Sequence, residues 1–249
     1  MLSMVRARWY GFVRTLPFWS SLGLLFVIAS ISAGSFIQGQ SASAGDLLGV
    51  FQAVPVAPYL VICLSCLWLV SATTFDEKED ALVNLLVGPE SRRDYVVAAM
   101  ICFCLQFLCA TAAFLAGFAV GTVLTGQPLS LGAEFAPTFL ARWLASFAVA
   151  LGYGALLLLL AVAIRRSAAV VIAAFVVLFG VVEQAVFQFG RVAPGGLPSR
   201  GALEKLSLYG QVGTLCDGDV PAIGATVFAL VLAVAFTALA VALLRRRRV

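Results

Sequence analysis

Long runs of apolar residues, separated by short polar stretches, make up most of the chain. A helix needs about 20 apolar residues to cross the ~30 Å hydrocarbon core of a bilayer, and six runs are long enough to do so. They leave little sequence for a soluble domain. The pattern therefore predicts a single all-α, polytopic membrane domain over residues 1–249. We expect its spans at residues 18–37, 52–73, 95–125, 137–163, 167–189 and 221–244.

Composition agrees with a membrane protein and excludes several kinds of chemistry. Hydrophobic residues make up 62% of the chain, against roughly 45–50% in soluble domains, and the mean hydropathy is +1.06. The chain has no histidine, which excludes HExxH zinc sites and histidine-based triads. Five of the six cysteines lie in apolar runs, where cysteine packs as a small hydrophobe. Cys216 is the exception, a free thiol or an intermolecular link in an expected external loop. We expect no catalytic residue and no metal site.

The distribution of arginine and lysine predicts the orientation of the spans. With the N-terminus in the cytoplasm, cytoplasmic segments contain twelve of the 16 basic residues and external segments four, as the positive-inside rule requires. The basic C-terminal tail fits this rule, so we expect no nucleic-acid partner. Both termini are expected in the cytoplasm of a multi-pass plasma-membrane protein. The alternative for the first run is a cleaved signal peptide that ends near Ser32-Ala33-Gly34.

The residues before the first span predict a short helix that lies in the membrane interface. Apolar positions recur there at helical spacing, two arginines lie off the apolar face, and a proline follows. The alternative is a basic flank without fixed structure. The apolar positions are Val5, Trp9, Phe12, Val13 and Leu16, the arginines are Arg6 and Arg14, and the proline is Pro17.

Residues 72–94 place nine charged residues between two apolar runs. Thr74 and Glu77 have the spacing of a capping box, which predicts the start of a helix. Gly88-Pro89 is a stop signal, and Ser91 begins a second, looser capping signature. The segment therefore predicts a short amphipathic helix over about 75–88, a sharp turn, and the start of the third span. The apolar face of this helix consists of Leu82, Leu85 and Leu86.

The stretch FDEKEDALVNLLVGPESRRDYVV resembles the cytoplasmic loop of ABC-2 type transporter permeases. In that family an acidic start, a leucine-rich helix and a Pro-x-Ser-Arg motif join the second and third spans. Asp80-Ala81 stands where the family usually has Gly-Thr. Six spans, cytoplasmic termini and an interfacial N-terminal helix also fit the family plan. The matching residues are Asp76, Glu77, Leu82, Leu85, Leu86, Pro89, Ser91 and Arg92.

The resemblance implies that these residues form a coupling helix, which docks on a separate ABC ATPase subunit. The chain has no GxxxxGK[ST] motif, and its only lysines are Lys78 and Lys205, so we expect ATP and Mg²⁺ to bind the partner and no cofactor to bind this chain. The family also implies a dimer of identical or related permeases. The implied function is export of an amphipathic or hydrophobic substrate, such as an antimicrobial peptide, a lipid-like compound or a drug. A secondary transporter and a non-transporting membrane scaffold are the alternatives.

Four polar side chains within the spans are candidates for a substrate path: Glu183, Gln184, Gln188 and Gln106. A carboxylate near the bilayer centre costs roughly 2.5–3.5 kcal/mol, so we do not expect Glu183 to face lipid. The alternative role for Glu183 is a structural pair with Arg142, at a similar depth in the fourth span. Gln106 also suits an interhelical hydrogen bond.

The long external loop at 190–220 is expected to contain a short helix that dips into the outer leaflet, as the family resemblance implies. The stretch ALEKLSLYG predicts an amphipathic helix that ends at Gly210. Two groups of small residues, Gly117-x-x-x-Gly121 and Gly152-Tyr153-Gly154, offer faces on which helices approach closely.

Overall fold

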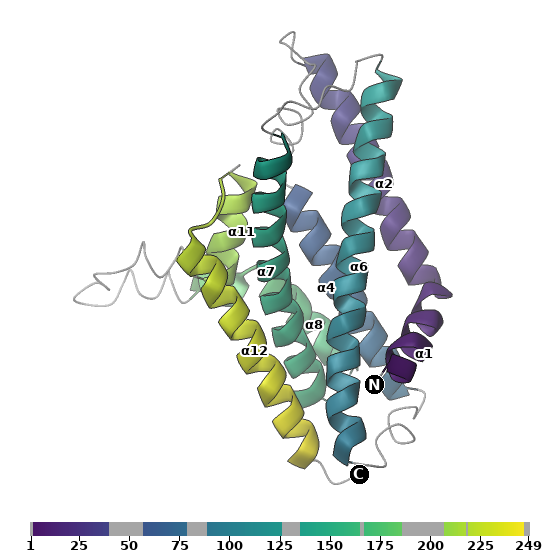
Figure 1. Ribbon diagram of the computed structural model, residues 1–249, viewed down its shortest axis with the longest axis vertical. Helices are drawn as coiled ribbons and strands as arrows, with labels where there is room; N and C mark the ends of the chain where they lie inside the picture. Colours follow the sequence, from purple (N-terminus) through teal and green to yellow (C-terminus); the bar gives the residue numbers. More distant parts are fainter. Residues whose placement is uncertain are drawn as a thin grey trace, which may run out of the picture.

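A computed structural model describes residues 2–39, 57–78, 89–125, 135–164, 167–185, 207–217 and 219–246. Within these ranges the regular structure is entirely helical, as the apolar runs predict. The helices pack side by side in an elongated bundle (Figure 1). They are α1 (Leu2–Val13), α2 (Leu16–Gly39), α4 (Ala57–Lys78), α6 (Pro89–Leu124), α7 (Phe135–Ala163), α8 (Ser167–Leu178), α11 (Leu208–Cys216) and α12 (Ile223–Arg246).

Four of the described helices are long and apolar enough to cross a membrane. Helices α4 and α8 contain shorter apolar stretches, at Pro58–Thr74 and Ala168–Leu178. Each predicted span thus overlaps an apolar helix, but only four of the described helices meet both the length and the hydropathy of a crossing, and the six-span count stays a prediction. The four crossing segments are Leu16–Ala33, Arg93–Leu124, Phe139–Ala163 and Ile223–Arg246.

Helix α8 is interrupted in the middle of the predicted span at 167–189. Its 12 residues extend about 18 Å at 1.5 Å per residue, which is well short of the ~30 Å hydrocarbon core. Gly180 has a φ of +63°, a conformation that glycine adopts without steric cost. The helix therefore ends before this residue, and residues 181–185 form a separate helical turn.

Helix α11 packs against the same two helices as α8, namely α4 and α7. In Figure 1 α8 lies behind the lower part of α7, and α11 lies beside its upper part. Two short helices together therefore cover one side of the bundle. The predicted end of a helix at Gly210 is wrong, because α11 begins at Leu208 and continues through Gly210 to Cys216. Ser207 caps it by accepting a hydrogen bond from Gly210 N at 3.0 Å.

The closest helix pair is α2 with α6, and the predicted glycine face makes it possible. A Cβ atom at Gly117 would collide with the carbonyl oxygen of Phe26, and one at Gly121 would collide with that of Ser30. Ser30 Oγ donates across this contact to Gly117 O at 2.8 Å. The two glycines thus let the backbones touch, in the manner of small-xxx-small packing in membranes.

Helices α7 and α12 form a second extensive contact, in which alanines take the place of the glycines. One face of α12 buries Ala225, Ala229, Ala233 and Ala240. On α7, a Cβ atom at Gly152 would lie 2.9 Å from Leu208 Cδ2 and 3.4 Å from Ala229 O. Gly152 therefore lies where α7, α11 and α12 meet.

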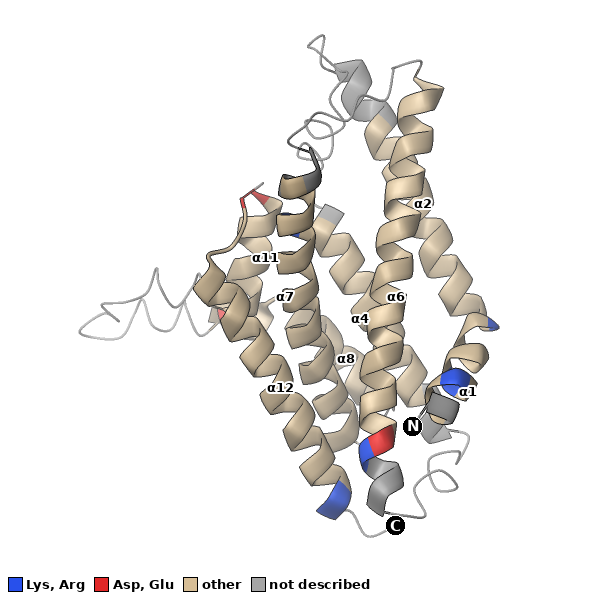
Figure 2. Cartoon of the chain, in the orientation of Figure 1, with Lys and Arg blue, Asp and Glu red and all other residues tan. Residues whose placement is uncertain are grey.

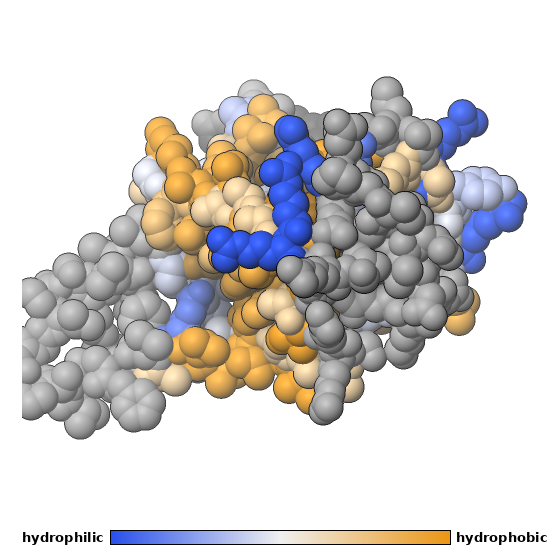
Figure 3. Space-filling model, turned by 90° about the horizontal axis from the view of Figure 1, so that it is seen from below, coloured by the Kyte–Doolittle hydropathy of each residue, from blue (hydrophilic) through white to orange (hydrophobic). Residues whose placement is uncertain are grey.

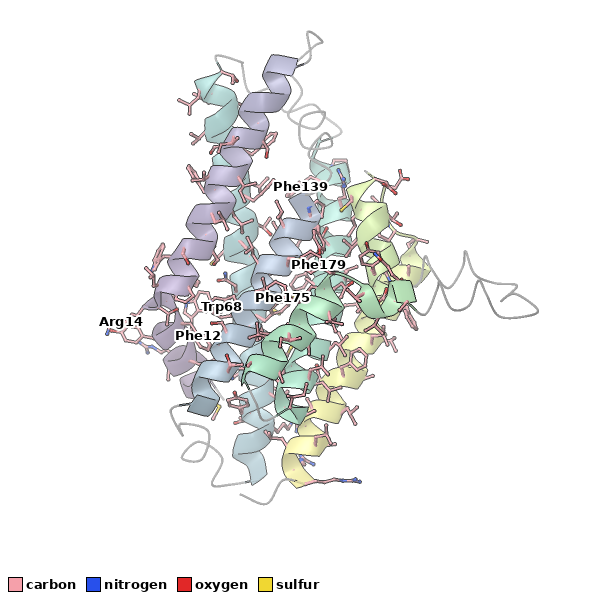
Figure 4. The ribbon with its side chains drawn as sticks, turned by 180° about the vertical axis from the view of Figure 1, so that it is seen from behind. Phe12, Arg14, Trp68, Phe139, Phe175 and Phe179 are labelled. Carbon is pink, nitrogen blue, oxygen red and sulfur yellow. The ribbon has the colours of Figure 1, made fainter. Side chains whose placement is uncertain are left out.

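Helix α1 confirms a helix before the first span, and an aromatic cluster joins it to α2 and α4. Phe12 and Phe18 are buried. The ring centroids of Phe12 and Trp68 lie 4.9 Å apart, side by side in Figure 4. Leu16 was predicted to belong to the apolar face of this helix, but its side chain is 82% exposed. The reason is that α1 ends at Val13 and the turn that follows directs Leu16 away from the bundle.

Most of the basic residues that the structure describes lie at one end of the bundle. In Figure 2 the basic positions on α1, α6 and α12 are at the same end, where α12 finishes with Arg245 and Arg246 in its last turn. Figure 3 views this end directly and shows hydrophilic side chains among hydrophobic ones. Helix α1 and the last turn of α12 therefore lie at the same end of the molecule. Placing that end in the cytoplasm stays a prediction.

Candidate functional site: the ends of α4 and α6 and the interior of the bundle

The predicted coupling segment begins at the end of α4 and finishes at the start of α6. Asp76 and Glu77 lie in the last turn of α4, whereas Pro89, Ser91 and Arg92 lie in the first turn of α6. The two helices contact each other, so both ends of the segment belong to the same part of the bundle. The three predicted apolar residues, Leu82, Leu85 and Leu86, lie outside the described residues.

Both predicted capping signatures differ from the structure. Thr74 is inside α4, and its hydroxyl donates to Ser71 O at 3.0 Å instead of accepting from a helix N-terminus. A threonine hydroxyl readily bonds to a carbonyl one turn earlier when apolar packing extends the helix past it. Helix α6 begins at Pro89, a favoured first residue of a helix, so Ser91 is not its cap. Helices α4 and α6 therefore extend further into the charged segment than predicted.

Arg8 of α1 binds the beginning of α6. Its Nη1 donates to Tyr95 O at 3.2 Å, and its Nη2 donates to Tyr95 Oη at 3.1 Å. The guanidinium carbon lies 4.2 Å from the centroid of the Tyr95 ring and 5.4 Å from that of Phe12, within the range of cation–π attraction. Tyr95 is buried and follows the Ser91-Arg92 motif by one helical turn. Helix α1 is thus attached to the start of α6, directly after the predicted coupling segment.

The sequence did not single out Arg8, although a usable signal was present. Arg8 lies one turn before Phe12 and three residues after Val5, on the face that the apolar spacing predicts to be buried. An arginine on a buried helix face requires a partner, and Tyr95 supplies carbonyl, hydroxyl and ring together.

Glu183 and Gln184 both bind the N-terminal end of α11. Glu183 Oε2 accepts a hydrogen bond from Tyr209 N at 3.1 Å, and Gln184 Nε2 donates to Tyr209 Oη at 2.8 Å. A carboxylate at this position also interacts favourably with the positive end of the helix dipole. These two side chains therefore fix one end of α11 to the chain that follows Gly180.

Arg142 binds the other end of α11. The residue is 3% exposed, and its Nη2 donates to Leu215 O at 2.6 Å. A cation near the C-terminal carbonyls is favourable for the same dipole. The hydrogen bonds of Arg142 to Leu215 O and of Tyr209 N to Glu183 thus join the two side chains to opposite ends of α11. The two side chains are therefore connected by α11, which both of them bind, and a direct ion pair between them stays a prediction.

The residues predicted for a substrate path do not come together in one place. Gln106 is 1% exposed and its Nε2 approaches Ser21 Oγ at 3.5 Å, so it faces α2, as interhelical bonding predicts. Glu183 and Gln184 instead face α11, and Gln188 lies outside the described residues. Within the described ranges, no group of three or more acidic or cysteine side chains is arranged to hold a metal ion.

A cavity of about 40 Å³ lies between α4, α6 and α7. One lining residue, Trp143, stacks on Phe147 outside the lining, with ring centroids 5.7 Å apart and planes inclined by 4°. Trp143 Nε1 donates to Thr111 Oγ1 at 3.3 Å. No pattern in the sequence indicated this cavity. It is lined by Pro58, Val61, Phe107, Thr111, Phe114, Leu115, Phe139, Arg142, Trp143 and Ser146.

Comparison of the sequence with protein families identifies the family of the chain. The sequence profile of the ABC-2 family transporter proteins matches residues 48–209. The chain belongs to the ABC-2 transporter family. The match includes α4, the charged segment, α6, α7 and α8, so it covers the stretch that carries the resemblance and much more of the chain. No curated protein matches the sequence. As an ABC-2 permease, the chain is a multi-pass membrane protein, and its family associates with an ABC ATPase.

Proposed function

We propose that this ABC-2 permease is the membrane subunit of an ATP-driven exporter. Family membership carries the proposal, and the absence of a phosphate-binding motif from the sequence supports a separate motor. ATP and Mg²⁺ then bind to the ATPase partner. The charged segment between α4 and α6 is the surface on which that subunit docks, and two permease subunits, identical or related, complete the transporter.

The link between α1 and α6 supports a role for this end of the bundle in force transmission. The segment that docks on the ATPase continues directly into α6, and Arg8 ties the first turns of α6 to α1. A displacement of the segment would therefore move α1 and α6 together, because packed helices shift as units. With both termini in the cytoplasm, this end of the bundle faces the ATPase.

The substrate that we propose is amphipathic or hydrophobic, for example a peptide, a lipid-like compound or a drug. The walls of the bundle are mainly apolar, and Gln106 and Glu183, two of the polar side chains within it, each face a neighbouring helix. A strongly charged solute would lose its hydration in such surroundings without compensation.

The test is co-expression and co-purification with a candidate ABC ATPase, followed by ATP hydrolysis in nanodiscs. We expect the ATPase to be retained by the parent protein and lost when Asp76 and Glu77 are both changed to lysine. The matched control reverses Asp217 and Asp219, two exposed acids beyond the end of α11, and should retain the ATPase. Retention by the first variant, with normal ATP-dependent transport, would contradict the proposal.

A further inference from the structure

The apolar face of α1 is covered by the bundle rather than by lipid. Val5, Trp9 and Val13 pack against the hydrophobic core, and Phe12 belongs to it. A helix that lies in a membrane interface ordinarily buries its apolar face in the bilayer. In α1 that face already contacts protein, so contact with the membrane falls to the opposite, outer side of the helix.

The outer side of α1 ends in an arginine that lies over a tyrosine ring. Arg14 directly follows the last residue of α1 and is exposed. Its guanidinium carbon lies 4.2 Å from the centroid of the Tyr10 ring, which precedes it by one helical turn. Figure 4 shows Arg14 at the outer edge of the bundle, whereas Phe12 and Trp68 lie inside it. The cation–π contact therefore holds the positive charge in one place on the outer surface.

The corner between α1 and α2 also presents apolar side chains beside this charge. The first crossing segment begins at Leu16, two residues after Arg14. Leu16 and Trp19 are 82% and 59% exposed, and Trp19 Nε1 donates to Val13 O at 2.7 Å, which fixes the indole against the residue before Arg14. Tryptophan is enriched at the level of the lipid headgroups. The corner thus presents a cation, an indole and an aliphatic side chain where headgroups meet hydrocarbon.

The sequence around the corner supplies no anion for Arg14. The first acidic residue of the chain is Asp46, so neither α1 nor α2 contains a carboxylate. Arg8, which is also on α1, is engaged with Tyr95 of α6. A phosphate is the anion that suits Arg14 best, because a guanidinium donates two parallel hydrogen bonds to it. Phosphate is also the group that phospholipids carry at this depth.

We propose that Arg14 binds the phosphate of an anionic phospholipid at the corner between α1 and α2, with Leu16 and Trp19 against the acyl chains. Tyr10 positions the guanidinium and does not itself bind the phosphate. The proposal goes beyond the exporter function, since it concerns a lipid of the surrounding membrane. It depends on the proposed orientation only for the leaflet, which is the cytoplasmic one, where anionic lipids attract basic residues.

Trp19 is a reporter for this site. The chain has four tryptophans, and replacing Trp9, Trp68 and Trp143 with phenylalanine leaves Trp19 as the single fluorophore. Brominated acyl chains quench a tryptophan only at close range. Phosphatidylcholine nanodiscs receive the same mole fraction of either brominated phosphatidylglycerol or brominated phosphatidylcholine, which compares an anionic with a neutral headgroup on identical chains. The ratio of the two quenching constants measures the enrichment of anionic lipid at the corner.

We expect brominated phosphatidylglycerol to quench Trp19 about fivefold more strongly, the preference that one basic residue provides near an anionic lipid surface. Arg14→Gln should bring the ratio to unity. Quenching by brominated phosphatidylcholine should stay unchanged in this variant, which verifies that the protein is folded and that Trp19 still faces lipid.

The matched control is Arg6→Gln, which removes the same charge from an exposed position on the same helix. Arg6 lies about 12 Å from Arg14 along the helix axis, at 1.5 Å per residue. This separation exceeds the Debye length of about 8 Å at physiological ionic strength. The control should therefore retain the preference for brominated phosphatidylglycerol.

Equal quenching by the two brominated lipids in the parent protein would overturn the proposal, since the corner would then face lipid without selecting a headgroup. A preference that persists in Arg14→Gln would overturn it as well. So would an equal loss in Arg6→Gln, because the whole basic end of the bundle would then attract anionic lipid without a site at Arg14. None of these results bears on ATPase binding, so the exporter assignment is tested separately.

Discussion

Arg142 and Glu183 hold opposite ends of the same helix, α11. The carboxylate of Glu183 accepts from Tyr209 N, and the guanidinium of Arg142 donates to Leu215 O. Each charge is placed at the end of the helix that its sign suits. A nine-residue helix is too short to be stable alone, so these two side chains, together with packing on α4 and α7, keep it in place.

Loss of Arg142 should release the C-terminal end of α11. A hydrogen bond to a charged group contributes about 1.5–3 kcal/mol, so Arg142→Gln is expected to expose Cys216, the last residue of the helix. The measurement is the rate of maleimide labelling of Cys216 in purified protein whose other cysteines are replaced by alanine. Arg245→Gln, at the far end of α12, serves as the control. An unchanged rate in Arg142→Gln would show that packing alone holds α11.

Gly180 should not tolerate a side chain. An L-residue at a φ of +63° costs roughly 1–2 kcal/mol, and a Cβ atom there would also collide with the ring of Tyr209. We expect Gly180→Ala to lower the thermal unfolding temperature of the permease in detergent. Gly213→Ala is the matched control, because nothing lies within 4 Å of a Cβ atom at Gly213. Adding Tyr209→Ala should remove the collision but leave the backbone cost, so only partial recovery is expected.

The apolar runs were sufficient to predict an all-helical membrane protein, because burial in lipid forces the backbone of each run into a helix. The interruption of the fifth run was not predictable in the same way. Gly180 is one of 22 glycines, and the ring of Tyr209, almost thirty residues later, packs where its Cβ atom would lie. A tertiary contact of this range leaves no periodic signal in the local sequence.

The candidate site, too, was predictable from the sequence only in part. The family motif from Asp76 to Arg92 could be identified from residue types alone, and the family match confirms the resemblance. The helix caps could not be predicted in this way. Thr74 has the right spacing for a cap, but it lies inside α4, where its hydroxyl bonds to Ser71 O. Arg142 was predicted as a structural pair with Glu183, yet one partner that the structure gives it is the carbonyl of Leu215, a group that every residue carries and no sequence pattern marks.

The α2–α6 contact should be sensitive to one methyl group. Overpacking a tight contact costs about 1–3 kcal/mol, and at Gly117 the colliding atoms belong to the backbone of Phe26, which cannot rotate away. Gly117→Ala is therefore expected to destabilise the permease against thermal unfolding in detergent. Gly23→Ala on α2 is the control, since nothing surrounds that position within 4 Å, and alanine there should be neutral or stabilising. Equal behaviour of the two variants would argue against close packing of these backbones.

The attachment of α1 to α6 should require arginine rather than positive charge alone. Arg8 reaches the carbonyl and the hydroxyl of Tyr95 with two different nitrogens while it lies over the ring, and the compact ammonium of lysine cannot reproduce that geometry. We expect Arg8→Lys to lower thermal stability and to weaken the coupling of ATP hydrolysis to transport in nanodiscs with the ATPase. Arg6→Lys, an exposed position on the same helix, should change neither. Tyr95→Phe removes only the hydroxyl contact and should cost about 0.5–1.5 kcal/mol, less than Arg8→Lys. If Arg8→Lys behaves like Arg6→Lys in both measurements, α1 is anchored by its aromatic cluster and the arginine contact does not transmit force.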